Sequence, residues 1–432
     1  MGFAQGVSGL NASAANLDVI GNNIANSGTI GYKSGSVQFA DVYAGSQIGL
    51  GAKVASLTQN FAAGAVQTST RVMDVAITNG DGFFRLTSPG GEVAYSRNGQ
   101  FNVDKNGFMV NAAGLQLTGF QVGANGAIAG GSPTALQLPT SAMTPKQTTN
   151  INAQFNLDAR AVNSPIIPVA TTFDANDSTT YNYSNAATIY DSLGNSHELV
   201  TYFRKNAVNT WDTYATADGY PLTAAGAMVA APTPAGPPTI ANSAKLADGT
   251  LGFDLNGILN GGAPSTLVGG KMSITGLDFG NGSAPMTFTT DVTGTTQFGN
   301  DNDVKKLTQD GFTSGVITSY AINQDGTVIG KYSNEQTKTL GQIVLSSFIN
   351  PNGLQSKGDN VWSETSASGQ PLTGTPGAGT KRGALVSGAL ESSNVDLTAE
   401  LVNLIIAQRT YQANSQTVKT QDQVMQTLMN MR

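Results

Sequence analysis

The C-terminal stretch of the chain most constrains what it can fold into. From Ser393 to Arg432 the sequence contains neither proline nor glycine, and its apolar residues recur every seven positions. One row is apolar throughout and consists of Leu397, Leu404, Tyr411, Val418 and Met425. The interleaved row is apolar only at its ends and consists of Leu401, Gln408, Ser415, Asp422 and Met429. This pattern predicts a long helix with a narrow apolar seam, as in a coiled coil.

The start of this helix carries its own signals. Ser393 followed by Asp396 predicts a capping box, and Asp396 and Glu400 suit the positive end of the helix dipole. A seam this narrow cannot cover the core of a globular domain. We therefore expect the helix to require a partner helix.

The other end of the chain offers that partner. Phe3, Leu10, Leu17 and Ile24 are spaced by seven, with Val7, Ala14 and Gly21 in the interleaved row. A helix over 3–25 would be roughly 35 Å long. Its glycines lower the helix propensity but allow close approach of a neighbouring backbone. The alternative is that the two ends are the first and last helices of an ordinary bundle, although no other segment has a comparable helical pattern.

Composition limits the class of protein. Only 12% of the 432 residues are charged, against about 25% in an average soluble domain. Glycine, with 52 residues, and small polar residues replace them, which is typical of β-rich extracellular or fibrous proteins. The net charge of −6 without a basic cluster argues against binding to nucleic acid or to an anionic membrane surface. The sequence predicts no membrane insertion, because no apolar run is long enough to cross a bilayer.

Cysteine and the N-terminal charges bear on export. The sequence contains no cysteine, so disulfides and thiolate metal sites are excluded. The first basic residue is Lys33, and the preceding segment has neither the basic region nor the apolar region of a secretory signal. If the protein leaves the cell, we expect a route that keeps its N-terminus.

The middle of the chain predicts β-structure in nested domains. Asn-Gly turns between short apolar segments, as at Asp104–Gly107, indicate hairpins, and 12 of the 16 prolines lie in 133–285. Because the two ends pair, every domain except the outermost must be discontinuous. The predicted fold is mixed and mainly β, with the terminal helices pairing as a coiled-coil-like core domain. Its predicted parts are a helical core domain at 1–28 and 394–432, extended linkers at 29–72 and 366–393, an inner β-domain at 73–145 and 309–365, and an outer β-domain at 146–308.

Two candidate chemical sites carry little weight. Asn102, Asp104 and Asn106 match the first half of a calcium-binding loop, but its twelfth position is Ala113 instead of glutamate. A plain hairpin turn is the favoured interpretation. His197 is the only histidine, and its polar surroundings predict an exposed imidazole. We therefore predict no catalytic, cofactor-binding or metal-binding residues, and no enzyme.

Three separate motifs carry a resemblance to a known family. The first is Asn22-Asn23-Ile24-Ala25-Asn26 followed by Thr29, Gly31, Tyr32 and Lys33. The second is Asp81-Gly82-Phe83-Phe84 together with Tyr95 to Phe101. The third is Ser393 to Leu397 together with Glu400 to Asn403 and Ala407 to Gln412. In this order they resemble the axial proteins of the bacterial flagellum, which form its rod, hook and hook-associated parts. The resemblance covers about 1–120 and 310–432 strongly and 150–290 more loosely.

Within this family, the insertion of roughly 160 residues between the inner-domain halves resembles that of hook subunits. The resemblance implies a subunit of a curved, hollow, extracellular tube, which acts as a flexible universal joint and transmits torque from motor to filament. It implies export by the flagellar type III apparatus without a cleaved signal. It further implies contacts with other copies and with the distal rod protein, the hook cap protein and the hook–filament junction protein. The alternatives are another axial subunit, or an extracellular adhesin or carbohydrate-active β-protein.

The predicted functional residues are those of the terminal helices. We expect assembly through Phe3, Val7, Leu10, Ala14, Leu17 and Ile24, and through Leu397, Leu401, Leu404, Tyr411, Val418, Met425 and Met429. We assign Asn22, Asn23, Asn26 and Gly31 to the helix end and its motif. Because ordering the ends costs more conformational entropy than one narrow pair of helices recovers, we expect them to fold fully only when many copies assemble.

Overall fold

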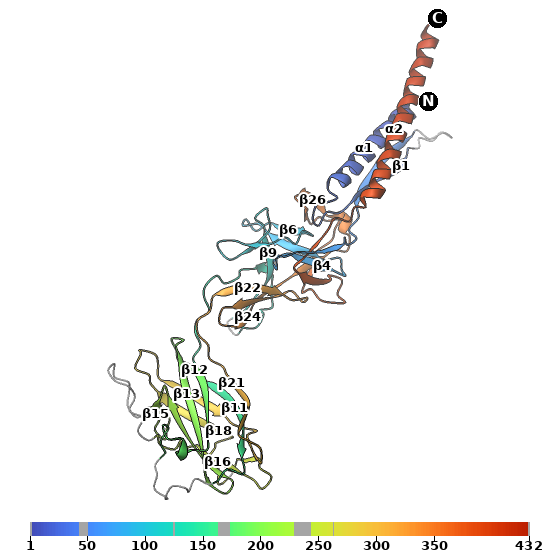
Figure 1. Ribbon diagram of the computed structural model, residues 1–432. Coiled ribbons are helices and arrows are strands. Elements are labelled where there is room, and N and C mark those ends of the chain that lie inside the picture. Colours follow the sequence, from blue (N-terminus) through green and yellow to red (C-terminus); the bar gives the residue numbers. More distant parts are fainter. Residues whose placement is uncertain are drawn as a thin grey trace. The chain divides into compact units, whose positions relative to one another are not determined.

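The computed structural model describes residues 2–42, 51–123, 126–162, 173–228, 243–261 and 263–430 (Figure 1). The chain divides into two compact units. Unit 1 comprises Met1–Ser141 and Ile317–Arg432, so it contains both ends of the chain. Unit 2 is the continuous segment Ala142–Val316. The described residues are mainly β, with helices from the two ends packed together, which confirms the predicted fold class.

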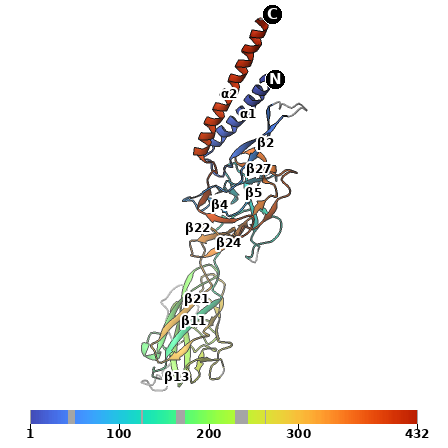
Figure 2. The same ribbon diagram turned by 90° about the vertical axis from the view of Figure 1, so that its right-hand side faces the viewer.

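The helices α1 (Gly2–Ala25) and α2 (Leu397–Asn430) run side by side in opposite directions (Figure 2). Asp396 forms the N-cap of α2, because its Oδ1 atom accepts hydrogen bonds from the backbone N–H groups of Thr398 and Ala399 at 2.9 and 3.1 Å. The side chain of Ser393 instead accepts from the N–H of Val395, so the predicted capping box does not form. No helix among the described residues is long and apolar enough to span a membrane.

Unit 1 contains one large sheet. Its main path follows the order β22 (Ile317–Ile322), β23 (Thr327–Tyr332), β24 (Thr337–Ile343), β9 (Gln116–Gln121), β5 (Phe83–Thr87), β6 (Val93–Ser96), β27 (Val361–Ser363) and β26 (Gln355–Gly358). Shorter strands join it at the sides, namely β7 (Asn102–Val103), β8 (Met109–Val110), β10 (Thr134–Ala135), β25 (Leu345–Ser347) and β28 (Leu372–Gly374). A 3-10 turn, Pro351–Gly353, precedes β26.

Smaller antiparallel pairs connect this sheet to the helices. They are β1 (Gly35–Asp41) with β2 (Ala52–Gln59), β3 (Val66–Thr68) with β30 (Ala389–Glu391), and β4 (Val75–Thr78) with β29 (Ala384–Ser387). Each of the last two pairs joins an N-terminal strand to a C-terminal one. The segments predicted as extended linkers, 29–72 and 366–393, therefore contain paired strands: β1 pairs with β2 within the first segment, and β3 and β30 pair the two segments with each other.

Two apolar clusters hold unit 1 together. The larger contains fully buried side chains such as Phe84, Phe101 and Leu117. The smaller is aromatic, consists of Phe83, Tyr95, Phe348 and Trp362, and has Phe61 packed edge-on against it. Because Phe61 follows β2, this contact attaches the β1–β2 hairpin to the sheet.

Unit 2 consists, over its described residues, of two sheets around one core. The first sheet contains β18 (Lys271–Leu277), β19 (Met286–Asp291), β11 (Asn150–Asp158), β20 (Thr296–Phe298) and β21 (Asp303–Gln309). The second contains β12 (Tyr183–Tyr190), β13 (Ser196–Ala207), β14 (Thr210–Ala217), β15 (Tyr220–Pro221), β16 (Thr250–Phe253) and β17 (Leu259–Asn260), and the 3-10 turn Ser178–Thr180 precedes it. Side chains of both sheets share one buried cluster, so the sheets pack face to face.

The predicted outer β-domain, 146–308, lies within unit 2. Residues 163–172, 229–242 and 262 of that prediction lie outside the described residues. So do 124–125 of the predicted inner domain, 43–50 of the predicted linker, and 1 and 431–432 of the predicted helical core domain.

Candidate assembly site: the terminal helices and the cluster that anchors them

Small and polar residues make the contact between α1 and α2. At Gly6, an added Cβ atom would lie 2.8 Å from Cγ2 of Val418, and at Gly9 it would lie 2.8 Å from the amide of Asn414. Hydrogen bonds from Asn23 to Glu400 (3.1 Å) and from Asn414 to Ser13 (3.4 Å) complete the contact. The two backbones can approach this closely only because α1 carries small residues on the face toward α2.

The face of α1 that is buried differs from the predicted one. Gly6, Ser13 and Ile20, which are also spaced by seven, are buried. Of the predicted residues, Phe3 is 55% exposed, and a second group remains half-buried, namely Val7, Leu10, Ala14, Leu17 and Ile24. The large apolar row was expected to face α2, but the row of small residues gives the closer contact.

In α2 only part of one predicted row is covered, and the other predicted row is not. Leu404 and Val418 are half-buried, whereas Tyr411 remains 41% exposed. The second row that approaches α1 contains Glu400, Ala407 and Asn414, in place of the predicted row that begins with Leu401. Large apolar side chains on α2 consequently stay exposed, namely Leu397, Leu401, Val402, Ile405 and Ile406.

The far end of α2 extends beyond α1. The contacts run from Asn23–Glu400 to Gly6–Val418. Because α1 begins at Gly2, four residues before Gly6, only about 423–430 continue past the start of α1, for roughly 12 Å. This extension exposes Val424, Met425 and Met429 by 49%, 58% and 74%. Within one chain, these side chains have no helix to pack against.

The asparagine motif ends α1 and ties it to the next strand. Asn26 donates to the backbone carbonyl and to the side chain of Asn22 (3.0 and 2.9 Å). Asn23 is buried, and its amide both donates to and accepts from the backbone of Gly35 at 2.9 Å. The same amide donates to Glu400, so a single side chain joins α1, β1 and α2.

Gly31 is required by its backbone conformation and by its surroundings. Its φ angle is +71°, in the left-handed region that glycine favours. A Cβ atom here would lie 2.8 Å from the backbone of Arg97 and of Asn98. Its N–H also donates to the carbonyl of Glu391 at 2.8 Å. The first and second sequence motifs therefore meet at this residue.

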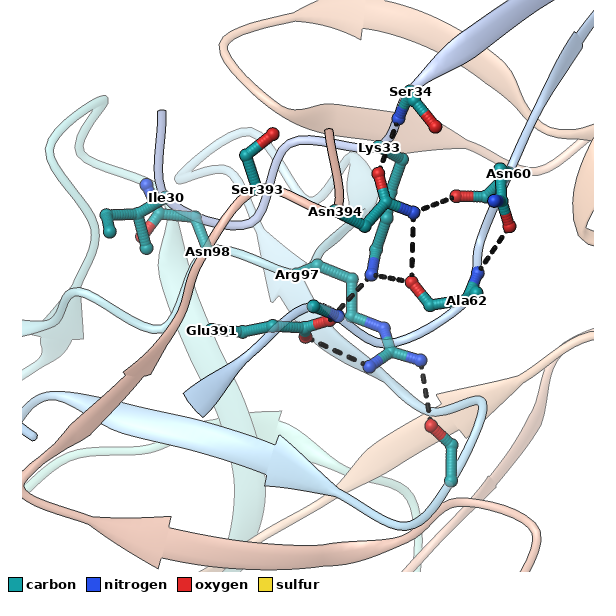
Figure 3. Close-up of polar contacts among 12 residues, drawn as sticks. Ile30, Lys33, Ser34, Asn60, Ala62, Arg97, Asn98, Glu391, Ser393 and Asn394 are labelled. Atoms are coloured by element: carbon teal, nitrogen blue, oxygen red, sulfur yellow. Dashed lines mark hydrogen bonds and ion pairs between the residues drawn. The ribbon is translucent and has the colours of Figure 1, made fainter. Parts of the chain in front are cut away.

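Immediately beside Gly31 lies a buried ion-pair cluster made of Lys33, Arg97 and Glu391 (Figure 3). The Lys33 ammonium lies 2.6 Å from one carboxylate oxygen of Glu391, and the Arg97 guanidinium lies 3.1 Å from the other. All three side chains are 1% exposed or less. Burial lowers the pKa of Lys33 against the opposing attraction of Glu391, and the nearby Arg97 lowers it further.

Hydrogen bonds join this ion-pair cluster to residues 62–64 and to Gly80. Lys33 donates to the carbonyl of Ala62 at 2.7 Å, Arg97 donates to that of Gly80 at 2.9 Å, and the N–H of Gly64 donates to Glu391 at 2.9 Å. The charges are thus solvated by protein groups in place of water, which a buried ion pair needs in order to be tolerated.

Asn394 extends the network to the start of α2 (Figure 3). Its amide donates to the carbonyls of Asn60 and Ala62 at 2.7 and 3.1 Å and accepts from the N–H of Ser34 at 2.8 Å. Residues just after α1 and just before α2 are therefore fixed to the same loop. This loop also carries Phe61, which packs on the aromatic cluster of the sheet.

Family models match four stretches of the chain. Four family models match: "Flagella basal body rod protein" over 5–33, "Flagellar hook protein FlgE/F/G D1 domain" over 76–156, "Flagellar basal body protein FlaE D2 domain" over 156–312, and "Flagellar basal body rod FlgEFG protein C-terminal" over 386–431.

Among curated proteins, the flagellar hook protein FlgE of Escherichia coli K12 is 47% identical over 435 residues, covering 100% of both chains. The chain belongs to the flagellar hook protein family. The hook protein FlgE of Salmonella typhimurium LT2 is 45% identical, again over 100% of both chains, and that of Borreliella burgdorferi is 31% identical over 99% of this chain and 98% of the relative. A solved structure of Helicobacter pylori flagellar hook protein FlgE2 aligns with a TM-score of 0.49 and 14% identity, over 76% of this chain and 99% of that one.

As a member of this family, the chain is a structural subunit of the flagellar hook that polymerises with its own kind. The predicted family is therefore confirmed. In this hook subunit, the three motifs quoted from the sequence converge on the ion-pair cluster, to which each motif or its flank contributes a residue: Lys33, Arg97 and Glu391.

Sequence reasoning assigned no role to these three residues. The signal that could have identified them is that charged residues lie in or beside the motifs of a chain that is otherwise poor in charge. Their meeting could not be inferred, because they come from segments separated by up to 358 residues.

The two weak chemical candidates are also placed by the structure. Asp104 accepts hydrogen bonds from the N–H groups of Asn106 and Phe108 at 2.9 and 2.8 Å, as expected for a hairpin turn. The prediction of an exposed imidazole at His197 is wrong, because its side chain is only 9% exposed. Its Nδ1 atom lies 2.7 Å from Asp218 and its Nε2 atom lies 3.3 Å from Asp191.

Proposed function

We propose that α1 and α2 from many copies together form the continuous wall of the hook tube. The observation that carries this proposal is the exposed apolar surface of α2. Large apolar side chains on its outer face and on its extension past α1 are 44–74% exposed, namely Leu397, Leu401, Val402, Ile405, Ile406, Val424, Met425 and Met429. Burying a side chain of this size stabilises a contact by roughly 1.5–3 kcal/mol.

The division of residues along α1 supports the same proposal. Small residues hold α1 against α2 within one chain, which leaves the row of larger apolar residues half-covered. Neighbouring copies would cover that row and the outer face of α2 together. We infer that the helices reach full stability only in this setting, as in coupled folding and binding.

Repetition of one head-to-tail contact gives an open helical tube. The β-structured units would provide the outer layers of this tube, with the inner domain at 73–145 and 309–365 and the outer domain at 146–308. Their few charges and many small polar residues favour wet contacts that slide at small cost, which suits a curved universal joint.

The remaining assignments follow from the resemblance to hook subunits. We propose that the chain acts outside the cell, is exported by the flagellar type III apparatus, and has no enzymatic activity. Its further partners would be the distal rod protein, the hook cap protein and the hook–filament junction protein.

A pair of charge substitutions one heptad apart tests the helical wall. Ile405 is 51% exposed, and Gln412 is an exposed polar residue seven positions later. Ile405→Glu should raise the critical concentration for polymerisation at least tenfold, because a charge replaces a buried apolar contact. Gln412→Glu should polymerise within about twofold of the wild type.

The measurement is sedimentation and electron microscopy of the purified full-length variants. Circular dichroism of the unpolymerised chain controls for helix content, which glutamate preserves. Wild-type polymerisation of Ile405→Glu would contradict a wall formed by α2.

A further inference from the structure

The lengths of the two terminal helices leave their alignment open. Helix α1 has 24 residues and α2 has 34, so the whole of α1 can lie along α2 in more than one register. In the observed register, Gly6 lies against Val418 and Asn23 lies against Glu400. If α1 moved by seven residues, or about 10 Å, toward the free end of α2, its full length would still lie beside α2.

The apolar residues of α2 do not select the observed register. After the move, Gly6 would face Met425, which is seven positions beyond Val418 and is also apolar. Met425 is 58% exposed in the observed register, so the move would cover an apolar side chain. A pattern that repeats every seven residues fits again after a shift of seven. Another feature must therefore select the register.

The attachment of α1 to the sheet also permits this move. Gly31 is held in place, because its N–H donates to the carbonyl of Glu391 at 2.8 Å. Between Gly31 and α1, residues 26–30 form turns, in which the N–H of Thr29 donates to the carbonyl of Asn26 at 3.1 Å. Five residues span about 17 Å when extended, which exceeds the move of about 10 Å. Opening these turns would release α1.

The side chain of Asn23 distinguishes the two registers. Asn23 is 1% exposed, and its amide uses both its donor and its acceptor positions. The amide nitrogen donates to the carbonyl of Gly35 at 2.9 Å and to Oε1 of Glu400 at 3.1 Å. The amide oxygen accepts from the N–H of Gly35 at 2.9 Å and from the hydroxyl of Tyr32 at 3.2 Å. These bonds fix Asn23 to β1 and to α2 at the same time.

The move would break these hydrogen bonds. Asn23 would leave Gly35, and it would face Ala407 in place of Glu400, because Ala407 is seven positions further along α2. Ala407 is 4% exposed and its methyl group cannot accept a hydrogen bond. A buried amide without partners costs free energy. Buried polar groups that are satisfied in one alignment only are known to select the register of coiled coils.

We propose that Asn23 is the positioning residue that fixes the register of α1 against α2. It thereby determines how far α2 extends past α1, and so whether Val424 and Met425 are left for other copies. This consequence rests on the proposed function of α2, whereas the register is a property of a single chain. The register can therefore be tested without polymerisation.

Two pairs of introduced cysteines report the two registers, since the natural chain contains no cysteine. Gly6→Cys with Val418→Cys reports the observed one, because a Cβ atom at position 6 lies 2.8 Å from Cγ2 of Val418. Gly6→Cys with Met425→Cys reports the shifted one, because a disulfide requires Cα atoms within about 7 Å and position 425 is about 10 Å further along α2. Each full-length chain is oxidised with copper phenanthroline in dilute solution. An intrachain disulfide appears as altered mobility on a non-reducing gel.

The ratio of the two disulfides measures the register. In the wild-type background, the 6–418 disulfide should exceed the 6–425 disulfide by about tenfold or more. Asn23→Leu should raise the share of the 6–425 disulfide about tenfold, because the shifted register then leaves no buried amide unpaired.

Substitutions of Glu400 and a control on α1 refine the test. Glu400→Leu should raise the share of the 6–425 disulfide less than Asn23→Leu does, because the bonds from Asn23 to Gly35 remain. Glu400→Gln keeps an acceptor and should stay within about twofold of the wild type. Asn11→Leu replaces an exposed residue of α1 and should leave the ratio unchanged.

Three outcomes would overturn the proposal. They are an unchanged ratio in Asn23→Leu, equal yields of the two disulfides in the wild-type background, and a parallel loss of both disulfides in Asn23→Leu. The last outcome would mean that Asn23 stabilises the helix pair without selecting its register. Failure of the helical wall would appear separately, as wild-type polymerisation of Ile405→Glu.

Discussion

Unit 2 and the terminal helices differ in how far their large apolar side chains are buried. In unit 2, large side chains such as Phe203, Trp211 and Leu251 are fully buried in a core shared by two sheets. In the helices, the contact within one chain is made by glycine, serine and asparagine, and Leu401 and Ile405 remain about half exposed, at 45% and 51%. The comparison teaches that unit 2 builds a core from its own two sheets, whereas the helices leave large apolar side chains that we propose are covered by other copies.

Within unit 1, the buried ion-pair cluster lies between the terminal helices and the sheet. It holds the residues just outside both helices against the sheet by charge pairing and backbone hydrogen bonds. Such a network depends on geometry, and it holds the chain just after the end of α1 and just before the start of α2. The anchored ends of the helices therefore differ from their free ends.

The largest expected effect comes from breaking this cluster. Glu391→Gln would leave the buried Lys33 and Arg97 without a counter-charge, and it should lower the free energy of unfolding of unit 1 by about 3–5 kcal/mol. Urea denaturation followed through Trp362, in a Trp211→Phe background, measures it. The control is Glu92→Gln, which removes an exposed pair with Lys357 and should cost less than about 1 kcal/mol. Equal costs for the two variants would refute a special role for the cluster.

Truncating one leucine in the core of unit 2 and one on α2 tests the difference between the two regions directly. Leu199 is 2% exposed in the core of unit 2, and Leu401 is 45% exposed on α2. Leu199→Ala should lower the free energy of unfolding of unit 2 by about 2–5 kcal/mol. Leu401→Ala should leave the unfolding of the single chain within about 0.5 kcal/mol of the wild type and should weaken polymerisation instead. Urea denaturation and sedimentation measure the two effects, and a large loss of monomer stability in Leu401→Ala would remove the contrast.

The sequence allowed the helices to be predicted but not the faces that they bury. Heptad spacing placed helices at both ends, and α1 and α2 lie there. The spacing also drew attention to the large residues Leu10 and Leu17, whereas the residues that contact α2 are Gly6, Gly9 and Ser13. The α1–α2 contact is made at small residues, which let the two backbones approach closely. A search for recurring large apolar residues therefore could not find it.

Polar contacts between residues far apart in the chain could not be predicted from the sequence either. Lys33 and Glu391 are 358 positions apart, and no local pattern marks one as the partner of the other. His197 illustrates the same limit, because polar neighbours predicted an exposed ring while Asp191 and Asp218, brought in by separate turns, enclose it. Turns were predicted more successfully, since Asn-Gly and Asp-Gly sequences act within a few residues.

The smallest expected effect is a loss of stability of unit 2 in acid. Burial opposes ionisation of Asp191, but hydrogen bonds from Asn195, Asn281 and His197 outweigh it and hold the pKa of that carboxyl well below its usual range. The pKa of Asp310 is lowered in the same way by Thr149, Asn150 and Lys146, again against the effect of burial. A carboxyl whose pKa is lower in the folded chain than in the unfolded one stabilises the fold only while it is ionised.

This stabilisation is complete above the pKa of an unfolded aspartate, about 3.9, and disappears as the pH falls toward the lower pKa of the folded state. The melting temperature of unit 2, followed through Trp211 in a Trp362→Phe background, should therefore drop below pH 4. Asp191→Asn should be less stable than the wild type at pH 7 by a few degrees and should lose less on acidification. Asp301→Asn, at a carboxyl that is 95% exposed, should keep the wild-type pH dependence. An identical acid response in Asp191→Asn and the wild type would mean that the stability of unit 2, unlike that of the ion-pair cluster in unit 1, does not depend on its buried carboxylate.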